Sequence, residues 1–418
     1  VEQINAKAET EFSAVSLASR QNLCLNEACR RLPPLEAIEA CNALRKAGRC
    51  RYRSVFDSSL PPSLPAVLST GKILRLGKTK RYCPYFLTRR MAENHTVVVA
   101  PYQYIFNEAI RAKVKLDVAG KILVFDEAHN ADKVGQEVLS DVLSERGLDS
   151  AKRELQLIDS SFTFIDDLKN YLDDNVSAEP VVRDGSELHQ ELEHLLGEEI
   201  SSFVEVLESI VEQIRLYKIR RDMVPVCYLN GVLSFLSLVD SSDGESYAAI
   251  YRRSSAGISL VEYRCLDPSL AIKPVLEEAY SAVIMSGTLS PLKLFTDVIG
   301  LTDAETRAYS AIARPENVHT YIDTSVTTRY KERDTHMLRL YGERISGLIS
   351  QVPHGVLIFF PQRGLMLQGL KSWTDNGFLK KIDNKLLFDT KEVFVEGDRA
   401  AENAKIVDDY KEAAKGAG

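Results

Sequence analysis

The sequence predicts an α/β protein with a binding site at the carboxyl edge of a parallel sheet. Short, fully apolar runs at 96–100 and 122–125 are separated by a helical pattern at about 102–113. Apolar strands that alternate with helices are typical of parallel sheets covered on both faces. An acidic pair, Asp126 and Glu127, directly follows the second run, which is where open α/β sheets bind ligands.

The remaining elements are expected in chain order on either side of these runs. They are a short strand at 12–18, an irregular cysteine-rich insert at 24–83, long amphipathic helices at 146–220, strand character at 247–265, apolar runs at 282–285 and 355–360, a short strand at 393–395 and a helix at 401–414. Within the amphipathic helices, Ile200, Phe203, Leu207, Ile210 and Ile214 recur at helical spacing. Packing against other helices is favoured over a groove for a partner.

Length and composition exclude several classes of protein. A chain of 418 residues is long enough for two or three domains. Its 45% hydrophobic and 27% charged residues match ordinary soluble chains, and no apolar run is long enough to predict a membrane span. Seven cysteines are too few for a disulfide scaffold. We therefore expect a reducing compartment in which thiols are free for metal binding or catalysis.

The net charge of −7 conceals a strong asymmetry along the chain. Residues 20–90 contain 15 Lys and Arg against 4 Asp and Glu, a balance of +11, so the remainder carries −18. A local site for a polyanion inside an otherwise acidic chain would produce this pattern. A solvated basic face is the alternative.

The acidic pair lies in the sequence Asp-Glu-Ala-His, which ends at His129. In nucleoside triphosphatases, the first carboxylate holds Mg²⁺ and the second orients the water that attacks the γ-phosphate. We predict these roles for Asp126 and Glu127, with His129 in the same catalytic group. A helix N-cap at Asp126, with Glu127 in the first turn, is the alternative.

Together with other stretches, this box resembles the XPD-type iron–sulfur helicases of superfamily two. The similar stretches follow the order of that family over nearly the whole chain. They are Ser-Leu-Ala-Ser-Arg-Gln-Asn-Leu-Cys (16–24), Tyr-Cys-Pro-Tyr-Phe (82–86), Leu-Asp-Pro-Ser-Leu-Ala-Ile-Lys-Pro-Val (266–275), Ser-Gly-Thr-Leu-Ser-Pro-Leu (286–292) and Val-Leu-Ile-Phe-Phe-Pro (356–361).

The resemblance implies two RecA-like parallel-sheet motor domains, both incomplete here, with an inserted iron–sulfur cluster domain and a helical arch. The implied segments are motor domain 1 at 1–22, 84–145 and 263–300, the cluster domain at 23–83, the arch at 146–262 and motor domain 2 at 301–418. It further implies an ATP-dependent 5′–3′ DNA helicase of nucleotide excision repair that uses ATP and Mg²⁺. A related iron–sulfur helicase for fork or recombination structures is the alternative.

Four cysteines are implied as ligands of a 4Fe-4S cluster: Cys24, Cys41, Cys50 and Cys83. Their spacing is too wide for a zinc knuckle, whereas four thiolates from a wrapping chain can bind a cluster. A Cys₄ zinc site is the alternative. Cys41 is favoured over Cys29 as the second ligand, and the apolar surroundings of Cys227 and Cys265 predict buried thiols.

Around these cysteines, cationic and aromatic residues are interleaved. Cations can follow phosphates while aromatic rings stack on unpaired bases, so single-stranded DNA is the expected partner. The predicted contacts are Arg20, Arg51, Arg53, Lys80, Arg81, Tyr85, Arg89, Tyr102 and Tyr104. Tyr85 is also expected to pack beside the cluster, and Arg20 to contact either DNA or a cluster sulfur.

The stretch Ser286-Gly287-Thr288 follows another apolar run and resembles the family's motif that couples nucleotide state to DNA movement. A tight turn before a helix is the alternative.

Duplex junctions and other repair proteins are further expected partners. The protein is expected to be a monomer and to bind no membrane. The expected location is the cytoplasm of an archaeal cell, or the nucleus of a eukaryotic one.

Two kinds of motif of such an enzyme are absent. A phosphate loop requires four residues between its glycines, but the nearest stretch, 71–79, has five and lies inside the cysteine-rich insert. The family's arginine motifs are also not found after residue 396. We therefore expect this chain to be a piece of a longer protein. Alone, it should not hydrolyse ATP and would be a catalytically silent DNA-binding or scaffold piece.

Overall fold

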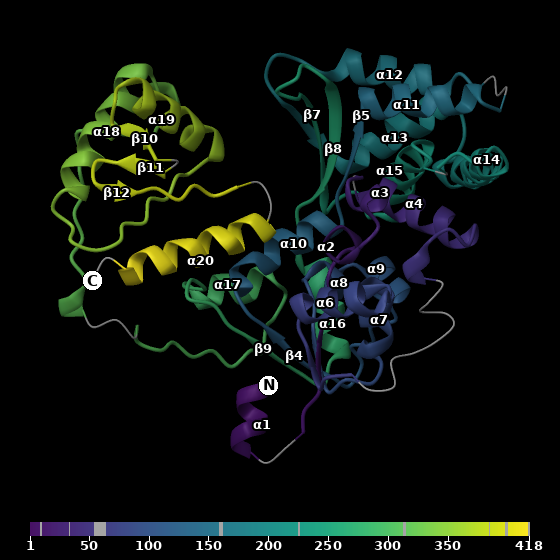
Figure 1. Ribbon diagram of the computed structural model, residues 1–418. Coiled ribbons are helices and arrows are strands. Elements are labelled where there is room, and N and C mark those ends of the chain that lie inside the picture. The colour runs from purple at the N-terminus through teal and green to yellow at the C-terminus, as the bar shows by residue number, and fades with distance from the viewer. Residues whose placement is uncertain are drawn as a thin grey trace. The chain divides into compact units, whose positions relative to one another are not determined.

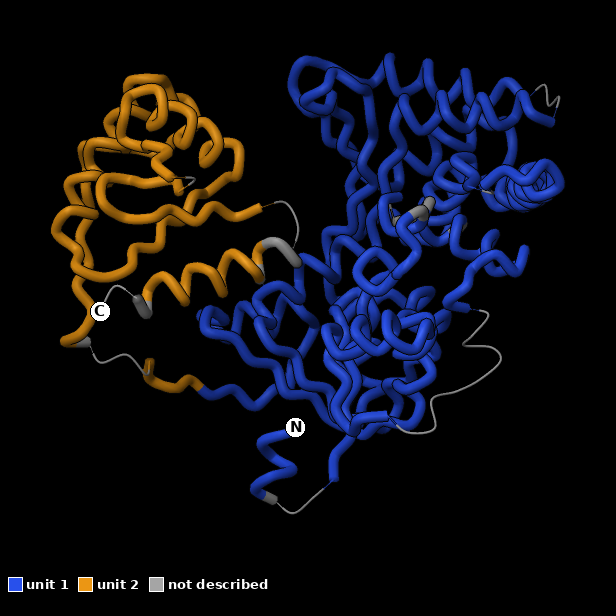
Figure 2. Tube along the Cα trace, in the orientation of Figure 1, with its two compact units in different colours: residues 1–307 blue, residues 308–418 orange. Residues whose placement is uncertain are grey.

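A computed structural model describes residues 1–8, 11–32, 34–53, 64–158, 162–224, 226–311, 315–383, 385–397 and 400–416. The chain divides into unit 1, residues 1–307, and unit 2, residues 308–418 (Figure 2). Among the described residues, no helix combines the length and the apolar character needed to cross a membrane.

Two small parallel sheets in unit 1 confirm the predicted α/β class. Their strands and flanking helices are α1 (Glu2–Ala8), β1 (Ala14–Ser16), β2 (Val67–Leu68), β3 (Val97–Val99), α8 (Gln103–Phe106), α9 (Glu108–Val114), β4 (Ile122–Phe125), the 3₁₀ turn η1 (Ala128–Asn130), α10 (Ala131–Val138), α16 (Ser269–Glu278), β9 (Ser281–Ile284) and α17 (Leu292–Val298). Strand β1 lies between β2 and β3. Strand β4 pairs with β9, and these two lie side by side in Figure 1.

The sheet of β4 and β9 is covered on only one face, which corrects the expectation of cover on both. Phe125 packs with Ala128, Ala131 and Ile272 in one core, so α10 and α16 lie against this face. On the two strands, Ile122, Val124 and Val283 remain more than half exposed. The described part of unit 1 therefore supplies helices for one side of this sheet.

The helix predicted at about 102–113 is divided in two. The side chain of Asn107 accepts a hydrogen bond from the backbone N–H of Ile110 at 2.9 Å, and this cap begins α9. The division leaves α8 as a separate turn shortly after β3. Its N-cap Tyr102 and its own Tyr104 contact different parts of the unit.

The cysteine-rich insert is largely helical where it is described, which corrects the expectation of an irregular segment. Its helices are α2 (Arg20–Leu23), α3 (Glu27–Arg30), α4 (Pro34–Lys46) and α6 (Thr70–Lys80), and α7 (Pro84–Ala92) follows it. The family resemblance at Cys50 includes the residues that follow it, of which Phe56 and Asp57 lie outside the described residues.

Residues 141–265, which include the segment predicted as the arch (146–262) and are called the arch below, form the largest hydrophobic core among the described residues. Its elements are β5 (Asp141–Ser144), α11 (Glu145–Gln156), α12 (Phe164–Asn175), β6 (Val181–Asp184), α13 (Gly185–Leu196), α14 (Ile200–Arg220), α15 (Leu229–Ser241), β7 (Tyr247–Arg253) and β8 (Ser259–Cys265). The strands form an antiparallel sheet in the order β5-β8-β7-β6, and the helices lie against one face of it (Figure 1). The five apolar residues predicted to repeat along α14 are all buried in this core, so core packing is confirmed.

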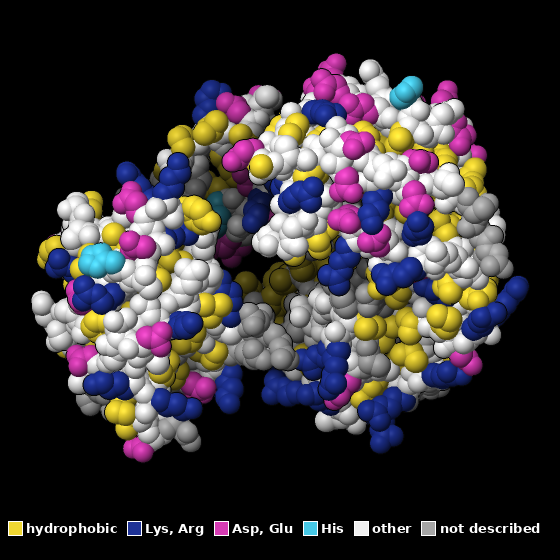
Figure 3. Space-filling model, turned by 90° about the horizontal axis from the view of Figure 1, so that it is seen from above, with side chains coloured by type: hydrophobic (Ala, Val, Ile, Leu, Met, Phe, Trp, Pro, Cys, Tyr) yellow, Lys and Arg dark blue, Asp and Glu magenta, His cyan; other side chains and the backbone are white. Residues whose placement is uncertain are grey.

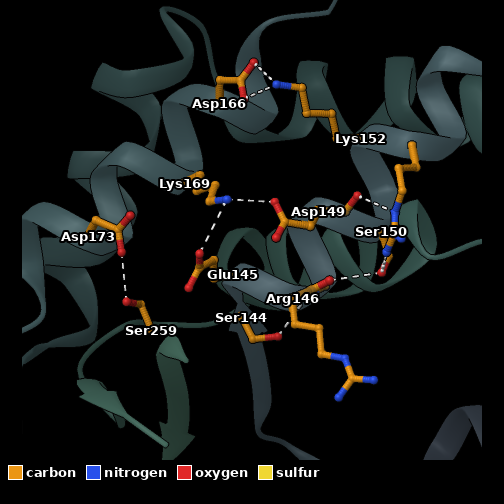
Figure 4. A network of polar contacts seen from close by, with 12 residues as sticks. Ser144, Glu145, Arg146, Asp149, Ser150, Lys152, Asp166, Lys169, Asp173 and Ser259 are labelled. Atoms are coloured by element: carbon orange, nitrogen blue, oxygen red, sulfur yellow. Dashed lines mark hydrogen bonds and ion pairs between the residues drawn. The ribbon is translucent and has the colours of Figure 1, made fainter. Parts of the chain in front are cut away.

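Polar contacts tie α11 to α12 at the surface of the arch (Figure 4). Lys169 donates to Asp149 at 2.8 Å and pairs with Glu145 at 3.4 Å. The bond to Asp149 raises the pKa of Lys169. Lys152 and Asp166 form a second pair at 2.6 Å, with both side chains nearly half exposed. Surface pairs of this kind contribute about 0–1 kcal/mol each.

A different ion pair lies inside the arch. Lys218 of α14 donates to Glu154 of α11 at 2.5 Å, and their side chains are 8% and 5% exposed. Glu154 also accepts from the backbone N–H of Leu229, and Lys218 donates to the carbonyl of Val226. Every partner that these two buried charges use is therefore supplied by the arch itself.

Unit 2 packs around Trp373, whose indole N–H donates to the carbonyl of Leu338 at 2.9 Å. The elements of the unit are η2 (Pro315–Asn317), η3 (Tyr330–Glu332), α18 (Thr335–Ile349), α19 (Arg363–Asp375), β10 (Leu379–Ile382), β11 (Lys385–Phe388), β12 (Lys391–Glu392) and α20 (Ala400–Gly416). The strands form an antiparallel meander, and α20 confirms the helix predicted at 401–414.

Two strand predictions in unit 2 are wrong. Residues 355–360 are described but form no strand, and Leu357 and Phe359 are mostly exposed. Apolar composition alone does not make a strand, because a strand also needs a neighbour for its backbone hydrogen bonds. The strand predicted at 393–395 is not found either. The nearest strand, β12, ends at Glu392, although the backbone N–H of Val393 still donates to the carbonyl of Leu386.

Candidate functional site

The register of β4 and β9 brings the acidic pair beside the Ser-Gly-Thr stretch. Phe125 and Ile284 are paired at the carboxyl ends of these parallel strands, so the residues that follow both strands emerge at one edge. Beyond the strands, Met285 donates to the carbonyl of Phe125 at 2.9 Å, and Ala128 donates to that of Met285 at 3.1 Å. Two segments far apart in sequence therefore lie side by side at this edge.

Ser286 stands at the centre of this site. Its Oγ lies 2.7 Å from Nδ1 of His129 and 3.4 Å from Oε2 of Glu127. It also accepts from the backbone N–H of Thr288 at 3.4 Å, and the two hydroxyls lie 3.5 Å apart. Gly287 is exposed between them. The serine therefore connects the acidic box to the turn that follows β9.

Glu127 and His129 also face each other directly. Oε2 of Glu127 lies 3.4 Å from Nδ1 of His129, and the side chains are 67% and 40% exposed. The exposed carboxylate of Glu127 is accessible to water, and Asp126 is exposed beside it. Exposed carboxylate oxygens at a strand edge are the ligands that Mg²⁺ prefers, usually together with several waters. The arrangement suits metal binding and activation of water.

The turn that holds Glu127 has an unusual backbone. Glu127 has a φ of +53°, a left-handed conformation that non-glycine residues rarely adopt. Oδ1 of Asp126 accepts from the backbone N–H of Glu127 at 3.0 Å. The structure does not support the alternative of a helix cap at Asp126, because α10 begins after Asn130. A strained residue held this way suits a functional site.

Tyr102 holds the same turn from α8. Its hydroxyl donates to the backbone carbonyl of Asp126 at 2.5 Å, and its ring packs against Phe106 and Phe125. Burial raises the pKa of Tyr102, with smaller contributions from the two carboxylates. Tyr102 was predicted to contact DNA, and the structure gives its hydroxyl this partner in the acidic box.

Tyr104, the second tyrosine of α8, points elsewhere. It is buried, and its hydroxyl donates to the carbonyl of Ala18 at 3.1 Å, just before the cysteine-rich insert. Burial raises the pKa of Tyr104 to about 12. A buried ring has no free face, so the structure does not favour a base stacked on Tyr104.

Five cysteines line one pocket in the insert: Cys24, Cys29, Cys41, Cys50 and Cys83. The walls between them include apolar groups of Leu25, Leu44, Pro84 and Phe86. Among the described residues, no group of three or more His, Cys, Asp or Glu side chains is placed to hold a single metal ion. Tetrahedral zinc, with Zn–S bonds of about 2.3 Å, requires its four sulfurs to converge closely, whereas a cluster of several irons keeps its thiolates farther apart.

Burial affects Cys24, Cys29 and Cys83 of this pocket. It raises the pKa of both Cys29 and Cys83 to about 12 and also raises that of Cys24. Cys83 interacts electrostatically with Cys41, Cys24 and Cys50. The pocket thus brings together two buried thiols, Cys29 and Cys83, and three partly exposed ones, and thiolates are the usual ligands of iron–sulfur clusters.

Cations stack on aromatic rings around the pocket. Arg20 lies over the ring of Tyr85 at 4.2 Å, Arg53 over Phe86 at 4.1 Å, and Arg89 over Tyr85 at 5.6 Å. Tyr85 is only 6% exposed, so it packs beside the cysteines as expected and leaves no face for a base. Nε of Arg20 is buried and has no hydrogen-bond partner among the described residues.

The predicted cations differ in their exposure. Arg51, Lys80 and Arg81 are exposed, and Arg51 also donates to the hydroxyl of Tyr52 at 2.8 Å. Lys80 ends α6, and Arg81 follows it with a φ of +59°. Figure 3 shows Lys and Arg side chains gathered in groups on one face of the molecule. Residues 71–79 lie within α6, which agrees with their rejection as a phosphate loop.

Asn130 completes the acidic box and was not predicted. Its side-chain amide lies 3.1 Å from Nε2 of His129 and donates to the carbonyl of Glu127 at 3.2 Å. Its position directly after the box was the only signal in the sequence. The roles of Asn130 and of Tyr102 both depend on contacts to the backbone, which side-chain motifs do not reveal.

Comparisons with known proteins point to one group of enzymes. A family model described as DEAD_2 matches residues 1–148. The XPD helicase subunit of the general transcription and DNA repair factor IIH from Arabidopsis thaliana is 25% identical, over 97% of this chain and 64% of that protein. The ATP-dependent DNA helicase chl1 from Schizosaccharomyces pombe is 24% identical, over 96% of this chain and 54% of that protein.

A solved structure titled as an XPD helicase has a similar fold. The TM-score is 0.55 at 20% sequence identity, and the match covers 87% of this chain and 62% of that one. The chain spans less than two thirds of the length of each of these proteins.

Proposed function

Because this chain is a distant homologue of the XPD/Rad3-family DEAD_2 helicases over nearly its whole length, we propose that it forms the central part of an ATP-dependent DNA helicase. The proposed enzyme moves 5′ to 3′ on single-stranded DNA and opens duplex junctions in nucleotide excision repair. The observation that carries this proposal is the contact of Ser286 with both Glu127 and His129.

The acidic site gives each of its residues a part in ATP hydrolysis. Asp126 would hold Mg²⁺, which neutralises charge on the phosphates when it is bound. Glu127 would orient the attacking water and accept its proton. Ser286 exchanges hydrogen bonds with this box, so a change at the nucleotide alters the turn that contains Thr288. This turn would pass the change toward DNA, as the family resemblance suggests.

The cysteine pocket would hold a 4Fe-4S cluster through Cys24, Cys41, Cys50 and Cys83. All four of these cysteines line the same pocket, and so does Cys29; Cys41 is kept as the second ligand because the family resemblance favours it. The bound cluster would join α2, α4 and the start of α7, since each carries or adjoins one of these cysteines. A Cys₄ zinc site remains the alternative, and the metal content of the purified protein, iron or zinc, distinguishes the two.

The exposed cations near the pocket would follow the DNA backbone. We therefore expect single-strand binding to weaken steeply with salt, at about 0.7 units of log affinity per log salt for each phosphate neutralised. Fluorescence anisotropy with a labelled single strand measures this slope. Replacing Arg51 and Lys80 by Gln should lower the slope, whereas replacing Lys152 and Arg153, exposed cations of the arch, should not.

The segment boundaries predicted from the sequence remain part of this proposal. Motor domain 1 would contain 1–22, 84–145 and 263–300, with the cluster domain and the arch inserted, and motor domain 2 would begin at 301. Strand displacement by the whole protein tests the assembled activity. A duplex with a 5′ tail should be unwound with ATP, and preference for a 3′ tail would refute the proposed direction.

A fork or recombination helicase is the second candidate. The chain is nearly as similar to the ATP-dependent DNA helicase chl1 as to the XPD relative, so the identities alone do not favour the XPD type. Unwinding rates on forked and simple 5′-tailed substrates distinguish the two candidates. A marked preference for forks would favour the second.

A further inference from the structure

Asn130 joins two parts of the acidic box through one amide group. Its Nδ2 donates to the backbone carbonyl of Glu127 at 3.2 Å and lies 3.1 Å from Nε2 of His129. A carbonyl oxygen only accepts, so the end of the amide that faces Glu127 is the NH₂ group. This group has two hydrogens, and the second one is directed to His129.

The amide contact assigns the hydrogen of a neutral His129 ring to Nδ1. A neutral imidazole has one donor and one acceptor nitrogen, and the partner of one nitrogen sets the role of the other. Because Nε2 accepts from Asn130, Nδ1 donates to Oγ of Ser286, which lies 2.7 Å away. The reverse assignment would point an N–H of His129 at the NH₂ group of Asn130.

The same direction continues through Ser286 to Glu127. Oγ of Ser286 accepts from His129 and from the backbone N–H of Thr288 at 3.4 Å, so its own hydrogen is left to donate. Oε2 of Glu127 lies 3.4 Å from this Oγ, and the hydroxyl of Thr288 lies 3.5 Å from it. The carboxylate is the preferred acceptor, because hydrogen bonds to charged groups are stronger than those to neutral ones.

We propose that Asn130 is a positioning residue that sets the direction of the hydrogen bonds from His129 through Ser286 to Glu127. This inference rests on the proposed function, in which Glu127 orients the attacking water and accepts its proton. One hydrogen of the amide holds the backbone of Glu127, and the other acts on its carboxylate through two side chains. Both hold the carboxylate in one orientation, which a general base requires.

Asn130→Asp in the whole protein tests the inference by ATP hydrolysis. Aspartate keeps the shape of asparagine, but its ionised carboxylate only accepts, so it repels the carbonyl of Glu127 and draws the hydrogen of His129 to Nε2. We expect kcat for DNA-stimulated hydrolysis to fall by at least about tenfold. KM for ATP should change by less than about threefold, because Asn130 acts through other side chains. A wild-type kcat in this variant overturns the inference.

Asn107→Asp is the matched control, because it makes the same change of amide to carboxylate at a helix cap. Oδ1 of Asn107 accepts from the backbone N–H of Ile110, and a carboxylate oxygen also caps a helix well. We expect kcat and KM of this variant to equal those of the wild type. An equal loss of kcat in both variants would assign the loss to the added charge and overturn the inference.

A measurement on the wild-type chain tests the inference without enzyme activity. The chain is labelled with ¹⁵N-histidine, and the signals of His129 are identified by their loss in His129→Gln. Protonated and unprotonated ring nitrogens have well-separated nitrogen shifts. At about pH 8, where an ordinary imidazole is neutral, we expect the hydrogen on Nδ1 in the wild type and on Nε2 in Asn130→Asp.

The two measurements separate the inference from the function on which it rests. A wild-type whole protein that hydrolyses no ATP refutes the proposed function and with it this role in hydrolysis. A wild-type spectrum with the hydrogen on Nε2 of His129 overturns the role of Asn130 even if ATP is hydrolysed. The wild-type spectrum decides the question even if Asn130→Asp does not fold.

Discussion

Two carboxylates of unit 1 each face a nitrogen base, but in opposite surroundings. Glu154 and Lys218 lie 2.5 Å apart with both side chains less than a tenth exposed, whereas Glu127 and His129 lie 3.4 Å apart with 67% and 40% exposed. The buried pair uses all of its partners within the arch. The exposed group shares its contacts with Ser286.

The difference shows how burial separates structure from chemistry. A buried charge is expensive to leave without a partner, so the contacts of Glu154 hold three elements in a fixed arrangement. An exposed carboxylate costs little when it changes partners, so Glu127 is free to exchange a hydroxyl for water or a metal ion. We therefore expect substitutions in the arch pair to change stability, and substitutions in the acidic box to change activity.

Lys218→Met should have the largest effect on stability. The substitution leaves the Glu154 carboxylate buried without its cation, which typically costs about 3–5 kcal/mol. Urea denaturation, with the resistance of the arch to trypsin as the readout, measures the loss of unfolding free energy. Lys152→Met is the matched control because it breaks an exposed pair, for which we expect a change of at most about 1 kcal/mol. Equal losses in the two variants would remove the contrast.

Tyr102→Phe should have an intermediate effect that is confined to the acidic box. It removes the hydrogen bond to the carbonyl of Asp126 and should lower the local opening free energy by about 0.5–1.5 kcal/mol. Hydrogen exchange of the peptide that contains residues 126–130 reports this change. Tyr104→Phe removes a hydroxyl from the same helix at its other contact, so it should leave that peptide protected. Unchanged exchange in Tyr102→Phe would show that the tyrosine does not hold the turn.

Asp141→Asn should have the smallest effect on the free energy of unfolding, and it should stabilise the protein rather than destabilise it. Burial raises the pKa of Asp141 in the folded arch, although it accepts from Ser234 and from the N–H of Val142. The folded state therefore binds the proton more tightly than the unfolded state, and stability falls as pH rises from the usual carboxyl range through the raised pKa.

Because asparagine does not ionise, Asp141→Asn should gain stability relative to wild type at neutral pH, and the gain should shrink in acid. Denaturation of both proteins across this pH range measures the difference. A gain that does not depend on pH would assign the effect to packing.

The sequence predicted features that are encoded by neighbouring residues. The run of residues 122–125 became β4, and the spacing from Ile200 to Ile214 became the buried stripe of α14. The box from Asp126 to His129 and the partner Ser286 were found because each follows an apolar run, and parallel strands bring such ends together.

Features that depend on long-range contacts were missed or assigned differently. Tyr102 looked like a base-stacking residue until its hydroxyl was found on the carbonyl of Asp126. Residues 355–360 looked like a strand because their composition does not show whether a neighbouring strand exists.

The most direct test of the account compares Glu127→Gln with Glu154→Gln in the whole protein. Both variants are assayed for ATP hydrolysis with and without single-stranded DNA, and for thermal stability. We predict that Glu127→Gln lowers DNA-stimulated hydrolysis by about 10²–10⁴-fold and changes stability by no more than about 0.5 kcal/mol. Glu154→Gln should destabilise the arch and leave hydrolysis by the remaining folded protein nearly unchanged. Full hydrolysis by Glu127→Gln would contradict the assignment of the acidic box as the catalytic site.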